Sequence, residues 1–350
     1  MNFQDHPGPL CAVDGIRGLA CFLVLLVHSV AHFHKESGPY LAGSGKIGVW
    51  LFFVLSAFLL SLRLQKRGFG LASLMDYAIG RCLRIVPPFV VACFIYYWAG
   101  IGIANSDELR DALTLRQGFI HLWTIPVEFK FYLLLPPLLA VIFLLQKKFG
   151  NAAMLAAVLF SVVVLQTIWP YSITPENSPD TRWYLATFIF GIPCALLLPR
   201  LRQLTTPGMA TSFGLITFLV LLLALPGTRH WLLGVPLSAD LANKHLYLGL
   251  LWAVFVALLS DGQGIIGRAL RGRGLSYIGR ISYSTYLFHF AIIVVLAERW
   301  PGSNLAALAG FVLSLLVGSL GYHLLERPAE RLRVVLSPYR LSTSAARSPS

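Results

Sequence analysis

The first apolar run of this 350-residue sequence contains one arginine and one histidine at an informative spacing. Arg17 opens the run and His28 lies eleven residues later, with no acidic or basic side chain between them. Eleven residues make about three helical turns, so both side chains lie on one face, about 16 Å apart along the axis. An ionisable group inside a membrane is costly unless it lines a cavity or finds a partner. His28 is therefore the first candidate catalytic residue, because imidazole commonly takes the proton from a hydroxyl group.

Two further histidines, His32 and His34, follow on the same segment. Histidines four residues apart occur in metal sites, but these two side chains approach the outer interface and no carboxylate lies beside them. We therefore expect no metal. A purely structural role for His28, as an imidazole hydrogen-bonded within a helix bundle, stays open at this point.

A second group of candidates is basic. Arg81 and Arg84 lie one helical turn apart, just before Pro87 and Pro88. Guanidinium groups bind phosphate through a planar fork of N–H donors, so these two residues and Arg17 are candidates for holding a phosphorylated ligand at the inner face. Simple anchoring of the inner face by positive charge explains the same pattern equally well.

Three more ionisable residues lie in apolar segments. Glu128 is expected about 8 Å below the outer end of its helix, at a depth similar to that of His28, where it would orient the imidazole. Lys130 projects elsewhere, toward the interface or into a local ion pair. His289 lies about 12 Å into a later helix and Glu326 closes the last apolar span, with structural and functional roles equally open for both.

The elements that position these residues are membrane helices. Hydrophobic residues make up 57% of the chain and charged residues only 12%, which excludes an ordinary soluble domain. We predict an all-α, polytopic membrane protein, because apolar windows long enough to cross about 30 Å of hydrocarbon recur along the whole chain. About ten transmembrane helices are expected, at 16–34, 47–62, 85–103, 123–145, 150–169, 183–199, 208–225, 241–260, 281–297 and 303–325.

Charge asymmetry predicts the orientation. With a cytoplasmic N-terminus, inner segments hold 19 of the 28 Lys and Arg residues and outer loops hold 8, so both termini are expected in the cytoplasm. The net charge of +13 then needs no nucleic-acid partner, although the basic inner face should attract anionic membrane lipid or a phosphorylated ligand. The five cysteines imply no disulfide framework.

We expect one membrane domain. It covers 16–326, after a cytoplasmic N-terminal segment at 1–15 and before a flexible, basic cytoplasmic tail at 327–350. The first helix is interpreted as an uncleaved anchor, because no small-residue cleavage site follows a short apolar core.

Six motifs in order resemble the integral-membrane acyltransferase 3 family, from Asp14 to about Pro328. They are DGIRGLA with a histidine further along the helix, GVWLFFVLSAF, RCLRIVP, HLWTIPVEFKFYLLLP, YIGRISYSTYLFH and LLERP. Arg17 and His28 match the arginine and histidine of the family's most diagnostic signature. The chain departs from the family pattern at Trp50, where an acidic residue is usual, and at Ala57, where glycine is usual.

The resemblance implies a bacterial inner-membrane, multi-pass O-acyltransferase. Its donor would be acyl-coenzyme A, most often acetyl-coenzyme A, as a co-substrate with no tightly bound cofactor. The acceptor would be a hydroxyl of an envelope glycan, exopolysaccharide or lipid-linked sugar. His28 would act as general base or relay the acyl group as an acyl-imidazole, with Glu128 orienting it, while Arg17, Arg81 and Arg84 hold the phosphates of coenzyme A. Many relatives carry an additional extracytoplasmic domain, so this chain is expected to complete the transfer within its bundle or pass the acyl group to a partner.

Two other classes of function remain possible from the residues. In a transporter or flippase, His28, Glu128 and His289 would relay protons or bind substrate. The absence of obvious repeats and the basic inner rim favour the enzyme. A non-catalytic assembly subunit is the third alternative.

Overall fold

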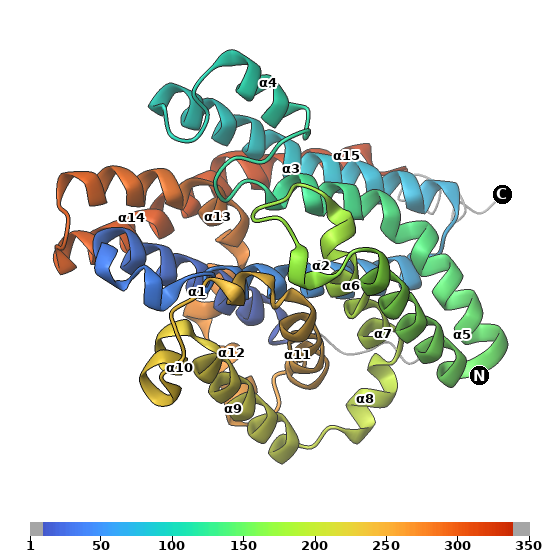
Figure 1. Ribbon diagram of the computed structural model, residues 1–350. Helices are drawn as coiled ribbons and strands as arrows, with labels where there is room; N and C mark the ends of the chain where they lie inside the picture. Colours follow the sequence, from blue (N-terminus) through green and yellow to red (C-terminus); the bar gives the residue numbers. More distant parts are fainter. Residues whose placement is uncertain (1–9, 339–350) are drawn as a thin grey trace.

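The computed structural model describes residues 10–338, and every regular element in that part of the chain is helical (Figure 1). The longer helices form a bundle in which α1, α2 and α13 run through the centre, with α3 and α15 along one side and α9 to α12 on the other. The α-helices are α1 Val13–Phe33, α2 Lys46–Arg67, α3 Leu71–Ala99, α4 Ser106–Leu113, α5 Thr124–Ile168, α6 Thr181–Ile189, α7 Gly191–Leu196, α8 Leu198–Leu204, α9 Pro207–Ala224, α10 Pro226–Leu233, α11 His245–Leu259, α12 Gly264–Leu270, α13 Arg273–Arg299, α14 Asn304–Gly321 and α15 Arg327–Leu336.

The all-α membrane architecture predicted from the sequence is confirmed. Seven helices of the described residues are long and apolar enough to cross a membrane, or nine if the bent segments α6 to α8 and α11 to α12 each form one span. The predicted number was about ten. The difference is one of counting, because α5 counts once although it consists of two helices joined at Gly150, and the predicted spans at 123–145 and 150–169 lie on either side of that break. Gly150 has φ 85°, a backbone conformation that glycine adopts without the penalty of a side chain.

The helices also extend further at the inner face than the apolar windows indicate. α3 starts at Leu71, well before the predicted span at 85–103, so that Arg81 and Arg84 lie inside the helix. Pro87 and Pro88 do not interrupt it. A hydropathy window stops where basic residues begin, but the helix continues through those residues into the interface.

The last span continues into the predicted tail. A π-helical turn at Tyr322–Glu326 joins α14 to α15, which lies along α3. The buried Glu326 carboxylate accepts hydrogen bonds from the backbone N–H of Ser284 (3.0 Å) and from its hydroxyl (2.6 Å), which ties the last span to α13. The rest of the predicted flexible tail, at 339–350, lies outside the described residues, as do 1–9.

Glycines allow α1 and α13 to pack at close range. A Cβ atom on Gly18 would lie 2.0 Å from the carbonyl oxygen of Leu275, and one on Gly279 would lie 1.7 Å from that of Asp14. Neither gap admits a methyl group. The two helices therefore meet backbone to backbone, as small residues permit in membrane bundles. This contact fixes the register between the helices that carry Arg17 and His289.

We predict that Gly279→Ala destabilises the protein by about 1 to 3 kcal/mol or more, because the added methyl group forces α13 away from α1. The shift should also break the contact between Arg17 and Ser282, one turn further along α13. The thermal unfolding midpoint of the purified protein in detergent measures the effect. Gly274→Ala is the matched control in the same helix, because a Cβ atom there meets nothing within 4 Å. An unchanged midpoint for Gly279→Ala would contradict the close-packing argument.

Candidate active site

A cavity of about 230 Å³ opens between α1, α2, α3, α5 and α13. On α2 its lining residues run from Val49 to Arg63, which corresponds to about 21 Å of helix. Phe52, Phe53 and several aliphatic side chains make much of the wall apolar. The cavity is therefore long enough to connect the predicted inner end of the bundle with its outer half.

Four arginines line this cavity, together with a single acidic residue, Glu128. The arginines are Arg17, Arg63, Arg81 and Arg84. Arg17 Nη2 donates a hydrogen bond to Ser282 Oγ at 3.2 Å. An excess of guanidinium groups over carboxylates in a partly apolar cavity favours an anionic ligand.

Arg81 has a buried donor that an anionic ligand would satisfy. Its Nε is buried without a hydrogen-bond partner among the described residues. Its guanidinium lies over the ring of Tyr132, 5.7 Å from the ring centroid. A buried donor without an acceptor is unfavourable, so a phosphate or carboxylate in the cavity would satisfy it.

Glu128 faces the same cavity. Its Oε1 accepts hydrogen bonds from the Ser56 hydroxyl and the Tyr132 hydroxyl. The expectation that Glu128 orients His28 is corrected by these contacts, because α5 turns the carboxylate toward α2 and the partner of the His28 ring lies on α13. Ser56 thereby supplies a polar group to the cavity wall.

The orienting contact to His28 comes from His289. His28 Nδ1 lies 2.8 Å from His289 Nε2, and the two rings are stacked with centroids 5.1 Å apart. His289 Nδ1 in turn faces two backbone carbonyl oxygens, those of Tyr286 (2.7 Å) and Thr285 (3.2 Å). Arg17 and His28 thus both face α13, as their shared helix face requires.

The hydrogen-bond network assigns the proton positions. Carbonyl oxygens only accept, so His289 Nδ1 carries a proton and its Nε2, in the neutral ring, is an acceptor. His28 Nδ1 must then donate to it, which leaves His28 Nε2 unprotonated. That nitrogen has no hydrogen-bond partner within 10–338. A Cβ atom on Gly45 would lie only 3.1 Å from Nε2, so the glycine leaves space in front of a basic nitrogen.

Tyr286 links the lining of the cavity to this histidine pair. Tyr286 lines the cavity, its hydroxyl donates to the carbonyl oxygen of His121 (2.7 Å), and its own carbonyl oxygen accepts from His289. The His121 ring packs edge-on against His289, with centroids 4.9 Å apart. Burial lowers the pKa of His121 well below its ordinary value, so this ring is neutral at pH 7.

The sequence-predicted residues are thus only partly brought together. Arg17, Arg81, Arg84 and Glu128 line one cavity, whereas His28 is not among its lining residues. Lys130 does project elsewhere, and donates to the carbonyl oxygen of Pro179 at 3.1 Å. Within the described residues there is no group of three or more His, Cys, Asp or Glu side chains that could hold a metal ion.

Several residues of this region were not singled out from the sequence. They are Arg63, Tyr132 and His121. Tyr132 lies four residues after Glu128, and that spacing on one face of α5 was the available signal for it. His121 precedes the helix, so helix spacing gives no signal for it.

The two departures from the family pattern lie in packed positions. Trp50 is fully buried and stacks on Tyr184. Ala57 is also fully buried, where α2 meets α7 at Gly191. Neither residue lines the cavity.

Comparison with known proteins shows which proteins this helical region resembles. A family model described as "Acyltransferase domain" matches residues 12–323. A Staphylococcus aureus (strain COL) protein named "Putative O-acetyltransferase" is 23% identical over 90% of this chain and 56% of its own length. The Listeria monocytogenes (serovar 1/2a, strain EGD-e) protein named "Peptidoglycan O-acetyltransferase OatA" is 22% identical over 91% and 56%, respectively.

A third relative, from Bacillus subtilis (strain 168), is named "Putative peptidoglycan O-acetyltransferase YrhL" and is 24% identical over 90% of this chain and 54% of its own. The chain therefore spans about half the length of the curated relatives that it matches. No solved structure matches.

Proposed function

Because this chain belongs to the family described as the acyltransferase domain, we propose that it is a membrane O-acyltransferase. It transfers an acetyl group from acetyl-coenzyme A to a hydroxyl of an envelope glycan or lipid-linked sugar. One observation carries the proposal. Tyr286 lines the same cavity as the arginines, and its carbonyl oxygen accepts a hydrogen bond from His289, which in turn contacts His28.

The donor end of the cavity fits a phosphorylated thioester. Arg17, Arg81 and Arg84 supply guanidinium forks for the diphosphate of coenzyme A, and the unpartnered Nε of Arg81 needs an acceptor. The apolar wall beyond them suits the pantetheine arm, which extends toward Tyr286. The positive-inside orientation puts this end in the cytoplasm, where acyl-coenzyme A is made.

The chemical step needs a base, and His28 Nε2 supplies it. Nε2 takes the proton of the acceptor hydroxyl while the hydroxyl oxygen forms a bond to the acyl carbon. The bond between that carbon and sulfur then breaks, and the coenzyme A thiolate leaves and recovers the proton. His289 keeps Nδ1 of His28 protonated, so the basic nitrogen remains the one in front of Gly45.

The acceptor is assigned from location and relatives. His28 lies in the outer half of α1, on the side opposite to the arginines. Two relatives are named as peptidoglycan O-acetyltransferases. We therefore infer an acceptor hydroxyl on a sugar at the outer side of the bacterial inner membrane.

Binding of the donor tests the proposal directly. Purified protein in nanodiscs should bind acetyl-coenzyme A more tightly than an acetyl-pantetheine thioester that lacks the nucleotide and its phosphates. Arg81→Gln or Arg84→Gln should weaken acetyl-coenzyme A binding by about 1.5 to 3 kcal/mol each, the worth of a hydrogen bond to a charged group. Titration calorimetry measures both effects.

Arg116→Gln is the matched control, because Arg116 is exposed on the predicted outer side, away from the cavity. Its affinity for acetyl-coenzyme A should equal that of the wild type. A folded protein that moves a glycan across the membrane but binds no acyl-coenzyme A would overturn the enzyme in favour of a transporter.

A further inference from the structure

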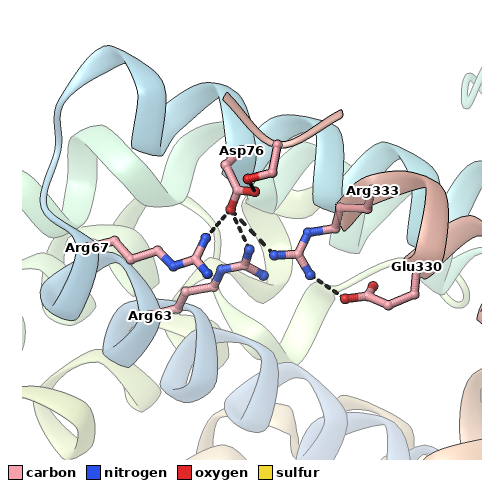
Figure 2. Close-up of polar contacts among 6 residues, drawn as sticks. Arg63, Arg67, Asp76, Glu330 and Arg333 are labelled. Atoms are coloured by element: carbon pink, nitrogen blue, oxygen red, sulfur yellow. Dashed lines mark hydrogen bonds and ion pairs between the residues drawn. The ribbon is translucent and has the colours of Figure 1, made fainter. Parts of the chain in front are cut away.

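Three arginines converge on one buried carboxylate next to the cavity (Figure 2). Asp76 on α3 is 1% exposed. Its Oδ2 accepts from Arg63 Nη2 at 2.6 Å, from Arg67 Nη1 and from Arg333 Nη2 at 3.4 Å. Its Oδ1 accepts from the Ser337 hydroxyl at 2.6 Å. We call these five residues the Asp76 node; it joins the C-terminal end of α2 to α3 and α15.

The Asp76 node carries more positive than negative charge. One carboxylate faces three guanidinium groups, and a second acid, Glu330, pairs with Arg333. The Glu330 side chain is 53% exposed, so that solvent screens this ion pair and it holds Arg333 only weakly. A buried carboxylate orients all three arginines, but it does not neutralise them.

The node is continuous with the donor cavity. Arg63 belongs to both, because it contacts Asp76 and also lines the cavity beside Arg81 and Arg84. Arg333 lies across Gly80, where a Cβ atom would come within 2.7 Å of its Nε. That Nε is buried and has no hydrogen-bond partner among the described residues. The next residue on α3 is Arg81, whose Nε also lacks a partner.

Two sets of arginines therefore lie along one path. The first set, Arg17, Arg81 and Arg84, is inside the cavity, and the second surrounds Asp76 nearer to the ends of α2 and α15. A linear ligand with a single phosphate group would need only one of these two sets of arginines. Coenzyme A carries two separate phosphate groups, a diphosphate in the chain and a 3′-phosphomonoester on the ribose. A phosphomonoester carries about −1.5 to −2 charge at pH 7, which matches the unbalanced charge of a guanidinium cluster.

We propose that Arg63, Arg67 and Arg333, held in place by Asp76, form a separate subsite for a phosphomonoester, the 3′-phosphate of the donor. The inference rests on the proposed use of acyl-coenzyme A. It adds that the 3′-phosphate at the nucleotide end of the donor binds at the Asp76 node, whereas Arg17, Arg81 and Arg84 bind the diphosphate. The C-terminal helix α15 thereby becomes part of the donor site through Arg333.

The test compares acetyl-coenzyme A with acetyl-3′-dephospho-coenzyme A. We use the full chain in nanodiscs of phosphatidylcholine, which contain no anionic lipid. The wild type should bind acetyl-coenzyme A at least about tenfold more tightly, because hydrogen bonds to charged groups contribute about 1.4 kcal/mol or more. Arg67→Gln and Arg333→Gln should each reduce this ratio severalfold. Arg84→Gln should weaken both donors alike and leave the ratio unchanged.

Two controls separate phosphate binding from a clamp between helices. Ser337→Ala removes a contact to Asp76 without removing a charge, so the ratio should fall less than in Arg67→Gln or Arg333→Gln. Arg273→Gln removes an exposed arginine at the start of α13 and should leave the ratio unchanged.

The outcomes that contradict the subsite are distinct from those that contradict the donor. Equal affinity of the wild type for both thioesters, with acetyl-coenzyme A binding intact, would overturn the subsite and leave the donor proposal standing. If Arg67→Gln and Arg333→Gln both keep the wild-type ratio of affinities for the two thioesters, the Asp76 node only holds helices together and does not bind phosphate. Loss of the wild-type ratio in phosphatidylglycerol nanodiscs would assign the node to lipid headgroups. No binding of acetyl-coenzyme A would overturn the proposed donor itself.

Discussion

His28→Ala should abolish acylation of the cell-surface product while the protein remains in the membrane at near wild-type abundance. A placed general base contributes about 10²- to 10⁴-fold to a proton-transfer step, so the expected loss is at least a hundredfold. The structural reason is the placement of His28 Nε2, which is unprotonated and lies in front of Gly45 while Nδ1 is fixed by His289. His289 Nε2 is occupied by His28, and the unpartnered Nδ1 of His121 is buried. Mass spectrometry of the extracted glycan, with immunoblotting of the membrane fraction, measures both quantities.

His34→Ala is the matched control for this experiment. His34 is a histidine just beyond the end of the same helix, and it pairs with Glu36 rather than with α13. Acylation should stay near the wild-type level. If His28→Ala itself loses no more than twofold, His28 is a packing residue and the catalytic assignment fails.

The sequence predicted a shared face on α1 but not the partner of that face. The eleven-residue spacing of Arg17 and His28 depends only on helix geometry, so it could be predicted without a structure. The partners Ser282 and His289 follow from the register between α1 and α13, which are some 250 residues apart in the chain. Close contacts at Gly18 and Gly279 set that register, and no local pattern encodes it.

The depth of Glu128 in the membrane could be predicted from the sequence, but the direction in which its side chain points could not. Its position below the outer end of α5 follows from counting residues. Which face of α5 meets which neighbour depends on packing of the whole bundle. In the structure the carboxylate meets Ser56 and Tyr132, so its role belongs to the cavity wall rather than to the imidazole.

Hydropathy also missed the inner ends of the helices for a physical reason. A hydropathy window scores apolar residues, so it ends before the arginines of α2, α3 and α15. The helices continue through these arginines. The Asp76 node lies in those continuations. Asp76 itself carries no sequence signal, because a single acidic residue among inner-face arginines looks like an ordinary surface charge until tertiary packing buries it.

The histidine pair connects two requirements that a bundle of this kind must meet at once. The donor end needs permanent positive charge, which would raise the cost of protonating a nearby imidazole. The proposed acceptor end needs a neutral imidazole with a defined free nitrogen. Separating the two ends by about 16 Å along α1 and fixing the tautomer through neutral contacts meets both requirements.

His289→Leu should therefore lower kcat about 100-fold and leave the affinity for acetyl-coenzyme A unchanged. Leucine fills a similar volume but cannot accept the proton of His28 Nδ1, so the His28 ring is free to rotate and to place its proton on either nitrogen. His289 does not line the donor cavity, so the arginine contacts are unaffected. Acetyl transfer to a purified glycan acceptor gives kcat, and calorimetry gives the donor affinity.

His289→Gln distinguishes a positioning role from a packing role. The glutamine carbonyl can accept from His28 Nδ1 while its amide donates to the carbonyl oxygen of Tyr286, so both hydrogen bonds of the native ring can be remade. We expect kcat within about tenfold of the wild type, because the remade contacts keep the basic nitrogen in front of Gly45. If both variants lose kcat equally, or if donor affinity falls with it, His289 supports the bundle only. If His289→Leu transfers acetyl groups at the wild-type rate, the tautomer of His28 needs no partner and the geometry argued from α13 is incidental to the chemistry.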